Sequence, residues 1–174
     1  MDYDFTWRDD ERTTRFARGA ILEAPRLIGE GFTLVSSARA REQHPNLELG
    51  AEQVVDVGAG FVDEIAGDIL ANVALSTRIV ALGGGRVIDT AKALGAAASQ
   101  PTLVAAIPTT LSAAEMTWVH RQARGAPAGS GTMRPQLVIT DPTVSASQPM
   151  PDLAASAANA LAHAIEGAVT GVAS

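Results

Sequence analysis

Three consecutive glycines are the strongest candidate for a ligand-binding turn in this sequence. Gly83, Gly84 and Gly85 follow an apolar run at 79–82 and precede a segment that is compatible with a helix. In α/β proteins this order builds phosphate-binding turns, because glycine lets the backbone approach a ligand and a helix start presents unpaired N–H groups. Apolar residues occupy the later glycine places of the dinucleotide fingerprint, and no Gly-Lys-Ser/Thr follows as in a P-loop. The glycines alone therefore fit a structural turn as well as a phosphate-binding one.

Two charged residues follow the glycines at a helical spacing. Asp89 and Lys92 are three residues apart, so they share one face of the first helical turns. Lys92 is the only lysine in the chain. The pair fits an ion pair on a solvated helix, and it also fits a carboxylate and an ammonium that contact the hydroxyls and phosphates of a ligand.

A second polar pattern lies near the C-terminus. Six residues recur at steps of four and three, which places them in one stripe of a helix made otherwise of Ala, Leu, Ile and Val: Asp152, Ser156, Asn159, His163, Glu166 and Thr170. The stripe fits a solvated face. Its small polar groups also suit a wet cleft or a surface that a partner covers. Asn159 and His163 are i and i+4 neighbours, but Asn is a poor metal ligand, so this pair alone does not indicate a metal.

The apolar pattern predicts the elements that position these residues. Strands are expected at 15–20, 32–35, 53–57, 78–82, 103–107 and 137–139, and helices at 21–29, 61–75, from the glycines to 98, and from 152 onward. Residues 36–50 are expected to form a surface helix or loop, and 121–134 an exposed loop or hairpin. Fully apolar strands that alternate with helices predict an α/β fold, a Rossmann-like parallel sheet with helices on both faces. Ligands of such sheets bind outside the carboxyl ends of the strands, so residues 83–86 and 108–115 should line one crevice.

Composition narrows the class of protein. The chain has 174 residues, 47% hydrophobic and 18% charged, which is enough for one well-buried domain. A net charge of −6 argues against nucleic acid and anionic membranes as partners. The absence of cysteine excludes disulfides, thiolate metal sites and a cysteine nucleophile. We find no signal-peptide pattern and no apolar run of membrane-spanning length, and we expect a cytoplasmic protein.

Three segments resemble the iron-containing alcohol dehydrogenases and their dehydroquinate synthase-like relatives. Residues 83–92 resemble the motif GGGSxxDxAK, residues 108–117 the loop that follows it, and residues 159–166 the helix motif DAxxHAIE. Residues 108–117 have the length and the Glu-Met-Thr ending of PTTYAGSEMT, the form found in maleylacetate reductases. The segment Asn159–His163 is likewise similar to the NAxAH of that branch, where the iron enzymes carry a metal-binding Asp.

The resemblance implies an NAD(P)-dependent oxidoreductase that uses NAD(P)H on a small-molecule substrate. It assigns cofactor binding to Gly83, Gly84, Gly85, Arg86, Val87, Asp89, Lys92, Thr109, Thr110 and Ser112, and catalysis to His163, which would face the nicotinamide. It implies no metal, because Asn159 replaces the family Asp. It further implies a dinucleotide-binding domain at 15–150 and the first helix of a C-terminal helical domain at 151–174. Residues 1–14 are polar, and we expect them to form a frayed or loosely docked lead-in.

Three departures from the family pattern stand out. Arg86 replaces the usual Ser, the loop between Glu115 and Leu137 does not align with family members, and the rest of the helical domain is absent from the sequence. The chain would then be one half of a split enzyme that pairs with a separate C-terminal-domain chain, a fragment, or a shortened protein without catalysis. We therefore expect a nucleotide-binding half that needs a C-terminal half for turnover, in a homo- or hetero-oligomer. The alternative is a non-catalytic nucleotide- or ligand-binding module.

Overall fold

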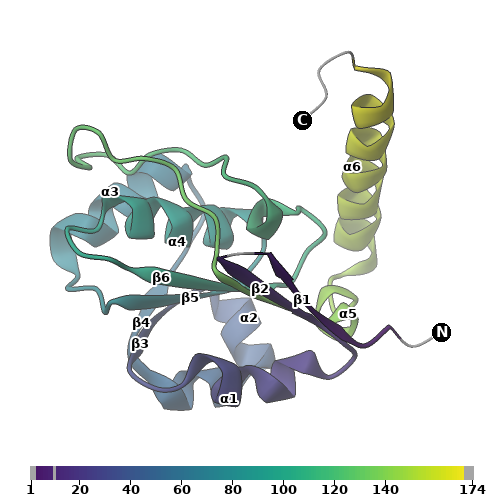
Figure 1. Ribbon diagram of the computed structural model, residues 1–174, viewed down its shortest axis with the longest axis horizontal. Coiled ribbons are helices and arrows are strands. Elements are labelled where there is room, and N and C mark those ends of the chain that lie inside the picture. Colours follow the sequence, from purple (N-terminus) through teal and green to yellow (C-terminus); the bar gives the residue numbers. More distant parts are fainter. Residues whose placement is uncertain (1–2, 10, 171–174) are drawn as a thin grey trace.

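A seven-stranded sheet forms the centre of the protein, whose computed structural model describes residues 3–9 and 11–170 (Figure 1). The strands lie in the order β1-β2-β7-β6-β5-β3-β4. Neighbouring strands are parallel except β1 and β2, which are antiparallel. The predicted parallel sheet is therefore confirmed. The strands are β1 Phe5–Asp9, β2 Arg12–Phe16, β3 Phe32–Ser36, β4 Ala51–Asp56, β5 Arg78–Gly83, β6 Leu103–Pro108 and β7 Leu137–Thr140.

Helices cover both faces of this sheet, as predicted. In Figure 1, α3 and α4 lie on one side and α1 and α2 on the other. The helices are α1 Ala24–Ile28, α2 Ala38–Gln43, α3 Val62–Asn72, α4 Gly85–Ala97, α5 Pro142–Ser145 and α6 Met150–Val169, with 3₁₀ turns at Ala20–Glu23, Pro45–Gly50 and Ala114–Met116. The short helix α5 was not predicted, because its four residues show no helical period.

Strand β5 shows why the apolar runs predicted a sheet buried on both faces. Ile79 and Ala81 belong to the core beneath α3 and α4, whereas Val80 and Leu82 belong to the core beneath α1 and α2. All four side chains are fully buried. Successive side chains of a strand point to opposite faces, so a strand without polar positions is stable only between two layers of helices.

The N-terminal segment differs from the prediction. Residues 1–14 were expected to be a loosely docked lead-in, but those described contain β1 and the start of β2, and residues 1–2 and 10 lie outside the described part. Strand β2 begins at Arg12 rather than at residue 15, and it pairs in parallel with β7. Phe5 stacks on Phe16 with ring centroids 5.2 Å apart. The partner strand lies more than a hundred residues away in the sequence, so long-range pairing overrides the polar local composition.

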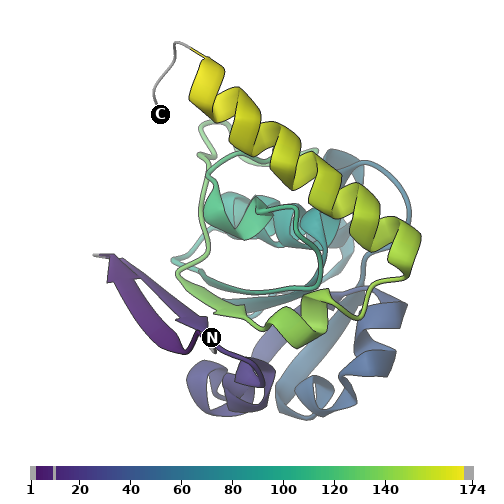
Figure 2. The same cartoon turned by 90° about the vertical axis from the view of Figure 1, so that its right-hand side faces the viewer.

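Helix α6 stands away from the sheet (Figures 1 and 2), and none of its residues is buried. A hydrogen bond from the Leu111 N–H to the Ser156 Oγ, 2.9 Å long, joins its first half to the loop after β6. Within residues 3–9 and 11–170, no helix has both the length and the apolar character that a membrane span requires.

Candidate functional site

The carboxyl ends of β3 and β5 form the point where the winding of the sheet reverses. From β3 the chain passes to β4 on one side, and it then returns to place β5 on the other side of β3, followed by β6 and β7. Helix α2 follows β3 on one face and α4 follows β5 on the opposite face. A crevice between such strand ends is where open α/β sheets bind their ligands. The glycines Gly83, Gly84 and Gly85, called the glycine corner below, lie at this point.

The structure brings the glycine corner and the loop after β6 together, as predicted. Gly83 is the register partner of Pro108 in the parallel β5–β6 pair. The Thr109 N–H donates to the Gly83 carbonyl at 2.9 Å. The two loops leave the sheet side by side, so residues from both can contact one ligand.

Each glycine of the corner allows a neighbouring side chain to pack closely. A Cβ added to Gly84 would lie 2.9 Å from the Thr110 Cγ2, and one added to Gly85 would lie 3.0 Å from the Ser112 Oγ. A Cβ on Gly83 would lie 2.6 Å from the Val87 Cγ2. We expected these glycines to let the backbone approach a ligand. They also let the loop after β6 lie directly against the start of α4.

The start of α4 has no side-chain cap. Its N-cap is Gly84, which has no side chain to cap the helix, and the first intrahelical bond runs from the Ile88 N–H to the Gly84 carbonyl. The N–H groups of the first turn, at residues 85–87, therefore have no intrahelical acceptor. The Thr110 Oγ1 is buried beside the corner without a hydrogen-bond partner. Unpaired donors at a helix start and an unpaired hydroxyl together fit the diphosphate of a dinucleotide.

Arg86 extends from this helix start across the ends of the strands. Its side chain is exposed, and its Nη1 donates to the Gly58 carbonyl, which follows β4, at 3.3 Å. The guanidinium thus lies on the β3–β4 side of the glycine corner, where its other N–H groups can bind phosphate oxygens. Asp89 lies one turn further along α4, and its Oδ1 accepts from the Lys92 Nζ at 2.9 Å.

Lys92 lies in the interior of the domain, between α4 and the loop after β6. Its side chain is fully buried, so it does not belong to a solvated helix face. The Nζ also donates to the Ala114 carbonyl at 2.9 Å and to the Val119 carbonyl at 2.6 Å. An ammonium has three N–H bonds, and all three are used within the protein. Lys92 therefore binds the loop after β6, and its role in cofactor binding stays a prediction.

Two further charged residues are buried at this loop: Glu115, which belongs to it, and Arg12, which lies on β2 and in none of the sequence motifs. Glu115 is buried, and its Oε2 has no hydrogen-bond partner. Burial raises the pKa of Glu115, against the opposing effect of Lys92 and Arg12. Arg12, on β2, is also buried and approaches the Glu115 carbonyl at 3.5 Å. Sequence reasoning missed Arg12, because its position depends on a hairpin that was not predicted.

His163 and Asn159 lie on the exposed helix α6. His163 is exposed, and its Nδ1 is 3.3 Å from the Glu166 Oε2 of the same helix. It stands two turns beyond Ser156, which is roughly 10 Å along the axis. Among the described residues, no three His, Asp or Glu side chains lie close enough to hold a metal ion. The absence of a metal and the catalytic role of His163 both stay predictions.

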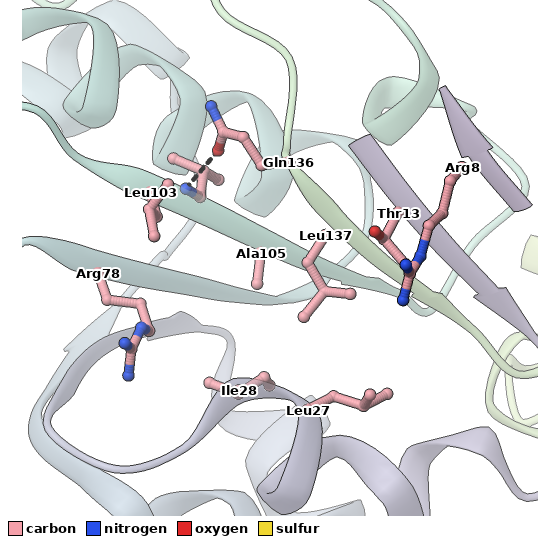
Figure 3. Close-up of a pocket in the computed structure, with 10 residues that line it drawn as sticks. Arg8, Thr13, Leu27, Ile28, Arg78, Leu103, Ala105, Gln136 and Leu137 are labelled. Carbon is pink, nitrogen blue, oxygen red and sulfur yellow. Dashed lines mark hydrogen bonds between the residues drawn. The ribbon is translucent and has the colours of Figure 1, made fainter. Parts of the chain in front are cut away.

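A groove of about 370 Å³ lies at the other end of the sheet (Figure 3). Its lining is mostly apolar, with two arginines and no carboxylate or histidine. The lining residues are Arg8, Thr13, Leu27, Ile28, Arg78, Leu103, Val104, Ala105, Gln136 and Leu137. Arg78, Leu103 and Leu137 are the first residues of β5, β6 and β7. The groove therefore opens at the amino ends of the strands, away from the glycine corner, and we do not place the site there.

Comparisons with known proteins identify the family of this chain. The sequence profile of the family "iron-containing alcohol dehydrogenase" matches residues 61–142, which include the glycine corner and the loop after β6. The chain is 30% identical over 139 residues to a maleylacetate reductase of Pseudomonas knackmussii, covering 72% of this chain and 39% of that protein. It is 29% identical over 161 residues to that of Sphingobium indicum, covering 91% and 44%.

A solved structure extends the likeness to the fold. The maleylacetate reductase of Agrobacterium tumefaciens superposes with a TM-score of 0.66 and 25% identity, and the match covers 96% of this chain and 51% of that one. A 1,3-propanediol oxidoreductase shares the fold with a TM-score of 0.71 at 22% identity. The chain thus spans about half the length, or less, of the relatives that it matches.

Proposed function

Because the chain belongs to the iron-containing alcohol dehydrogenase family of NAD(P)-dependent dehydrogenases and reductases, as its nucleotide-binding N-terminal domain, we propose that it binds NAD(P)H at the glycine corner. We further propose that it is the nucleotide-binding half of a reductase similar to the maleylacetate reductases. The hydride comes from the bound nicotinamide, and the protein orients the cofactor and substrate for its transfer.

One observation carries this proposal: the glycine corner and the loop after β6 lie side by side at the reversal point of the sheet. The start of α4 offers uncapped N–H groups there, and the Thr110 hydroxyl lies beside them without a partner. Unpaired N–H groups at a helix start that follows the carboxyl end of a parallel strand are the arrangement with which α/β proteins bind phosphate groups.

The proposed roles follow from the contacts. The N–H groups of residues 85–87 hold the diphosphate, and Arg86 binds one of its phosphates or a further phosphate of the cofactor. Thr110 and Ser112, which pack against the corner, contact the ribose or phosphate. The Thr109 N–H is bonded to Gly83, so Thr109 fixes the two loops together, and its hydroxyl is the part that remains for the cofactor.

Turnover needs more than this domain supplies. His163, which we propose to face the nicotinamide and substrate, is exposed on a helix of which no residue is buried. The relatives are about twice as long as this chain. We propose that a C-terminal helical half, on a separate chain or on a further segment, covers α6 and closes the substrate site.

Titration of the purified chain with NADH and with NADPH, followed by nucleotide fluorescence, tests the binding step. Gly84→Ala should weaken the binding about tenfold. The added Cβ would lie only 2.9 Å from the Thr110 Cγ2, so the Thr110 side chain and its loop would have to shift. Gly131→Ala is the matched control, since no atom lies within 4 Å of its added Cβ. No binding of either nucleotide to the unchanged chain would refute the proposal.

Mixing the chain with a C-terminal half from a maleylacetate reductase tests the turnover step. Oxidation of NAD(P)H by maleylacetate in the mixture, but not with either half by itself, would support a split reductase. Binding without turnover in every mixture would instead support the non-catalytic nucleotide-binding module. The activity should persist in EDTA, because Asn159 stands where a metal-binding Asp is expected, and activity that requires added Fe²⁺ or Zn²⁺ would contradict this.

A further inference from the structure

We propose that Lys92 and Arg12 are positioning residues that hold the loop of residues 108–119 in its nucleotide-binding shape. The inference rests on the proposed function for its effect on binding, but the structural part can be tested without it. Neither residue reaches the crevice. Both act through main-chain carbonyls of the loop that carries Thr110 and Ser112.

Lys92 fixes the loop at two points. Its Nζ donates to the carbonyls of Ala114 and Val119, which are five residues apart, and so closes this part of the loop around one cation. The side chain is fully buried, and Asp89 balances its charge. A buried ammonium is tolerated only when paired and hydrogen-bonded, so this arrangement strongly favours one loop geometry.

The segment that Lys92 closes is connected directly to the glycine corner. Ala114 is two residues from Ser112, whose Oγ accepts the Ala114 N–H at 3.4 Å. Ser112 in turn lies against Gly85, and Thr110 lies against Gly84. A shift of the Ala114 carbonyl would therefore move the side chains that pack beside the open start of α4.

Arg12 contacts the same loop from the hairpin of β1 and β2. Its Nη1 lies 3.5 Å from the carbonyl oxygen of Glu115, which is the residue after Ala114. The guanidinium lies over the Trp7 ring, 5.4 Å from its centroid, and Asp9 lies 4.0 Å from its Nε. The hairpin of β1 and β2 thus presents a buried cation to the loop, and the Glu115 carboxyl interacts electrostatically with both Lys92 and Arg12.

Three variants test the inference in the full chain. Lys92→Met and Arg12→Met keep the apolar stems but remove the donors to the loop. Arg124→Met is the matched control, because it removes the exposed ion pair with Glu64 and leaves residues 108–119 untouched. We expect the first two variants to raise the Kd for NAD(P)H about tenfold and the control to change it less than twofold. Arg12→Lys, which restores a cation, should recover part of the affinity.

Hydrogen exchange separates positioning from general stability. In Lys92→Met and Arg12→Met, amides of residues 109–119 should exchange faster while those of β5 and β6 keep their protection. Such loop-specific exchange, with weaker binding at temperatures where the variant is folded, supports the inference. Unchanged exchange in the loop, or unchanged Kd in a folded variant, overturns it.

The outcomes distinguish this inference from the proposed function. If the unchanged chain binds neither NADH nor NADPH, the proposed function fails, and the exchange of residues 109–119 still decides whether Lys92 and Arg12 hold the loop. If the chain binds nucleotide and Lys92→Met binds equally well, the proposed function stands and the inference is wrong. If Lys92→Met does not fold, Arg12→Met and Arg12→Lys carry the same test.

Discussion

Ala113 adopts a backbone conformation that should make its replacement by glycine stabilising. Its φ is 56°, and among the described residues it alone has a positive φ without being glycine. The left-handed conformation costs a residue with a Cβ roughly 1–2 kcal/mol, whereas glycine adopts it freely. The greater freedom of glycine in the unfolded chain offsets roughly 0.5–1 kcal/mol of this gain. Ala113 is exposed, so no packing is lost. Ala113→Gly should therefore raise the free energy of unfolding by about 0.5–1 kcal/mol.

Urea unfolding followed by circular dichroism measures this effect. The midpoint should rise without a change in the slope, and the melting temperature should rise by about 1–4 °C for a domain of this size. Ala146→Gly is the matched control, because Ala146 is also exposed but has a φ of −71°. That variant should lose roughly 0.5–1 kcal/mol. Equal losses in both variants would refute the strain at Ala113. The motif PTTYAGSEMT, which residues 108–117 resemble, has Gly at this place, and glycine adopts the left-handed conformation without the cost of a Cβ.

Three further changes test other parts of the structure. Asp141 is buried and accepts from the N–H and the hydroxyl of Thr143; burial alone would raise its pKa, but these bonds lower it below the ordinary 3.8. Asp141→Asn should cost about 2 kcal/mol at pH 7, a difference that shrinks as the pH falls through the lowered pKa; an equal cost at pH 3 would contradict this. Burial raises the pKa of Glu115, so its ionisation destabilises the fold. Denaturation from pH 4 to pH 8 should show wild type losing stability relative to Glu115→Gln, and a constant difference would oppose it. Gly67→Ala, in α3, should destabilise although alanine favours helices, because its Cβ would lie 2.8 Å from the Arg124 carbonyl oxygen; a higher melting temperature would refute the clash.

The adjacency of the two loops could be predicted because it depends on local signals alone. The apolar runs that became β5 and β6 are each buried on both faces, which requires a parallel sheet between helices. Parallel strands end at one edge, so the segments that follow neighbouring strands meet there. Gly83 and Pro108 are register partners for this reason.

The direction of a charged side chain could not be predicted in the same way. The three-residue spacing of Asp89 and Lys92 gives the same ion pair whether the helix face is solvated or buried. What buries Lys92 is the return of residues 114–119 across α4, and that path depends on tertiary contacts such as the one with Arg12. The hairpin of β1 and β2 was missed for a related reason, since its partner β7 is remote in sequence.

Helix α6 exposes apolar side chains that the proposed C-terminal half would cover. Asn159, His163 and the rest of the polar stripe lie on one side of the helix, whereas Leu161 and Ile165 lie on the opposite side, with Val169 next to Ile165. These three apolar side chains are 56–77% exposed, and burying each fully would contribute roughly 1.5–3 kcal/mol. A helix that served only as a solvated surface would not expose its apolar side as well. A partner that buries the apolar side and places the stripe along a cleft would satisfy both faces, which is the arrangement that the proposed C-terminal half requires.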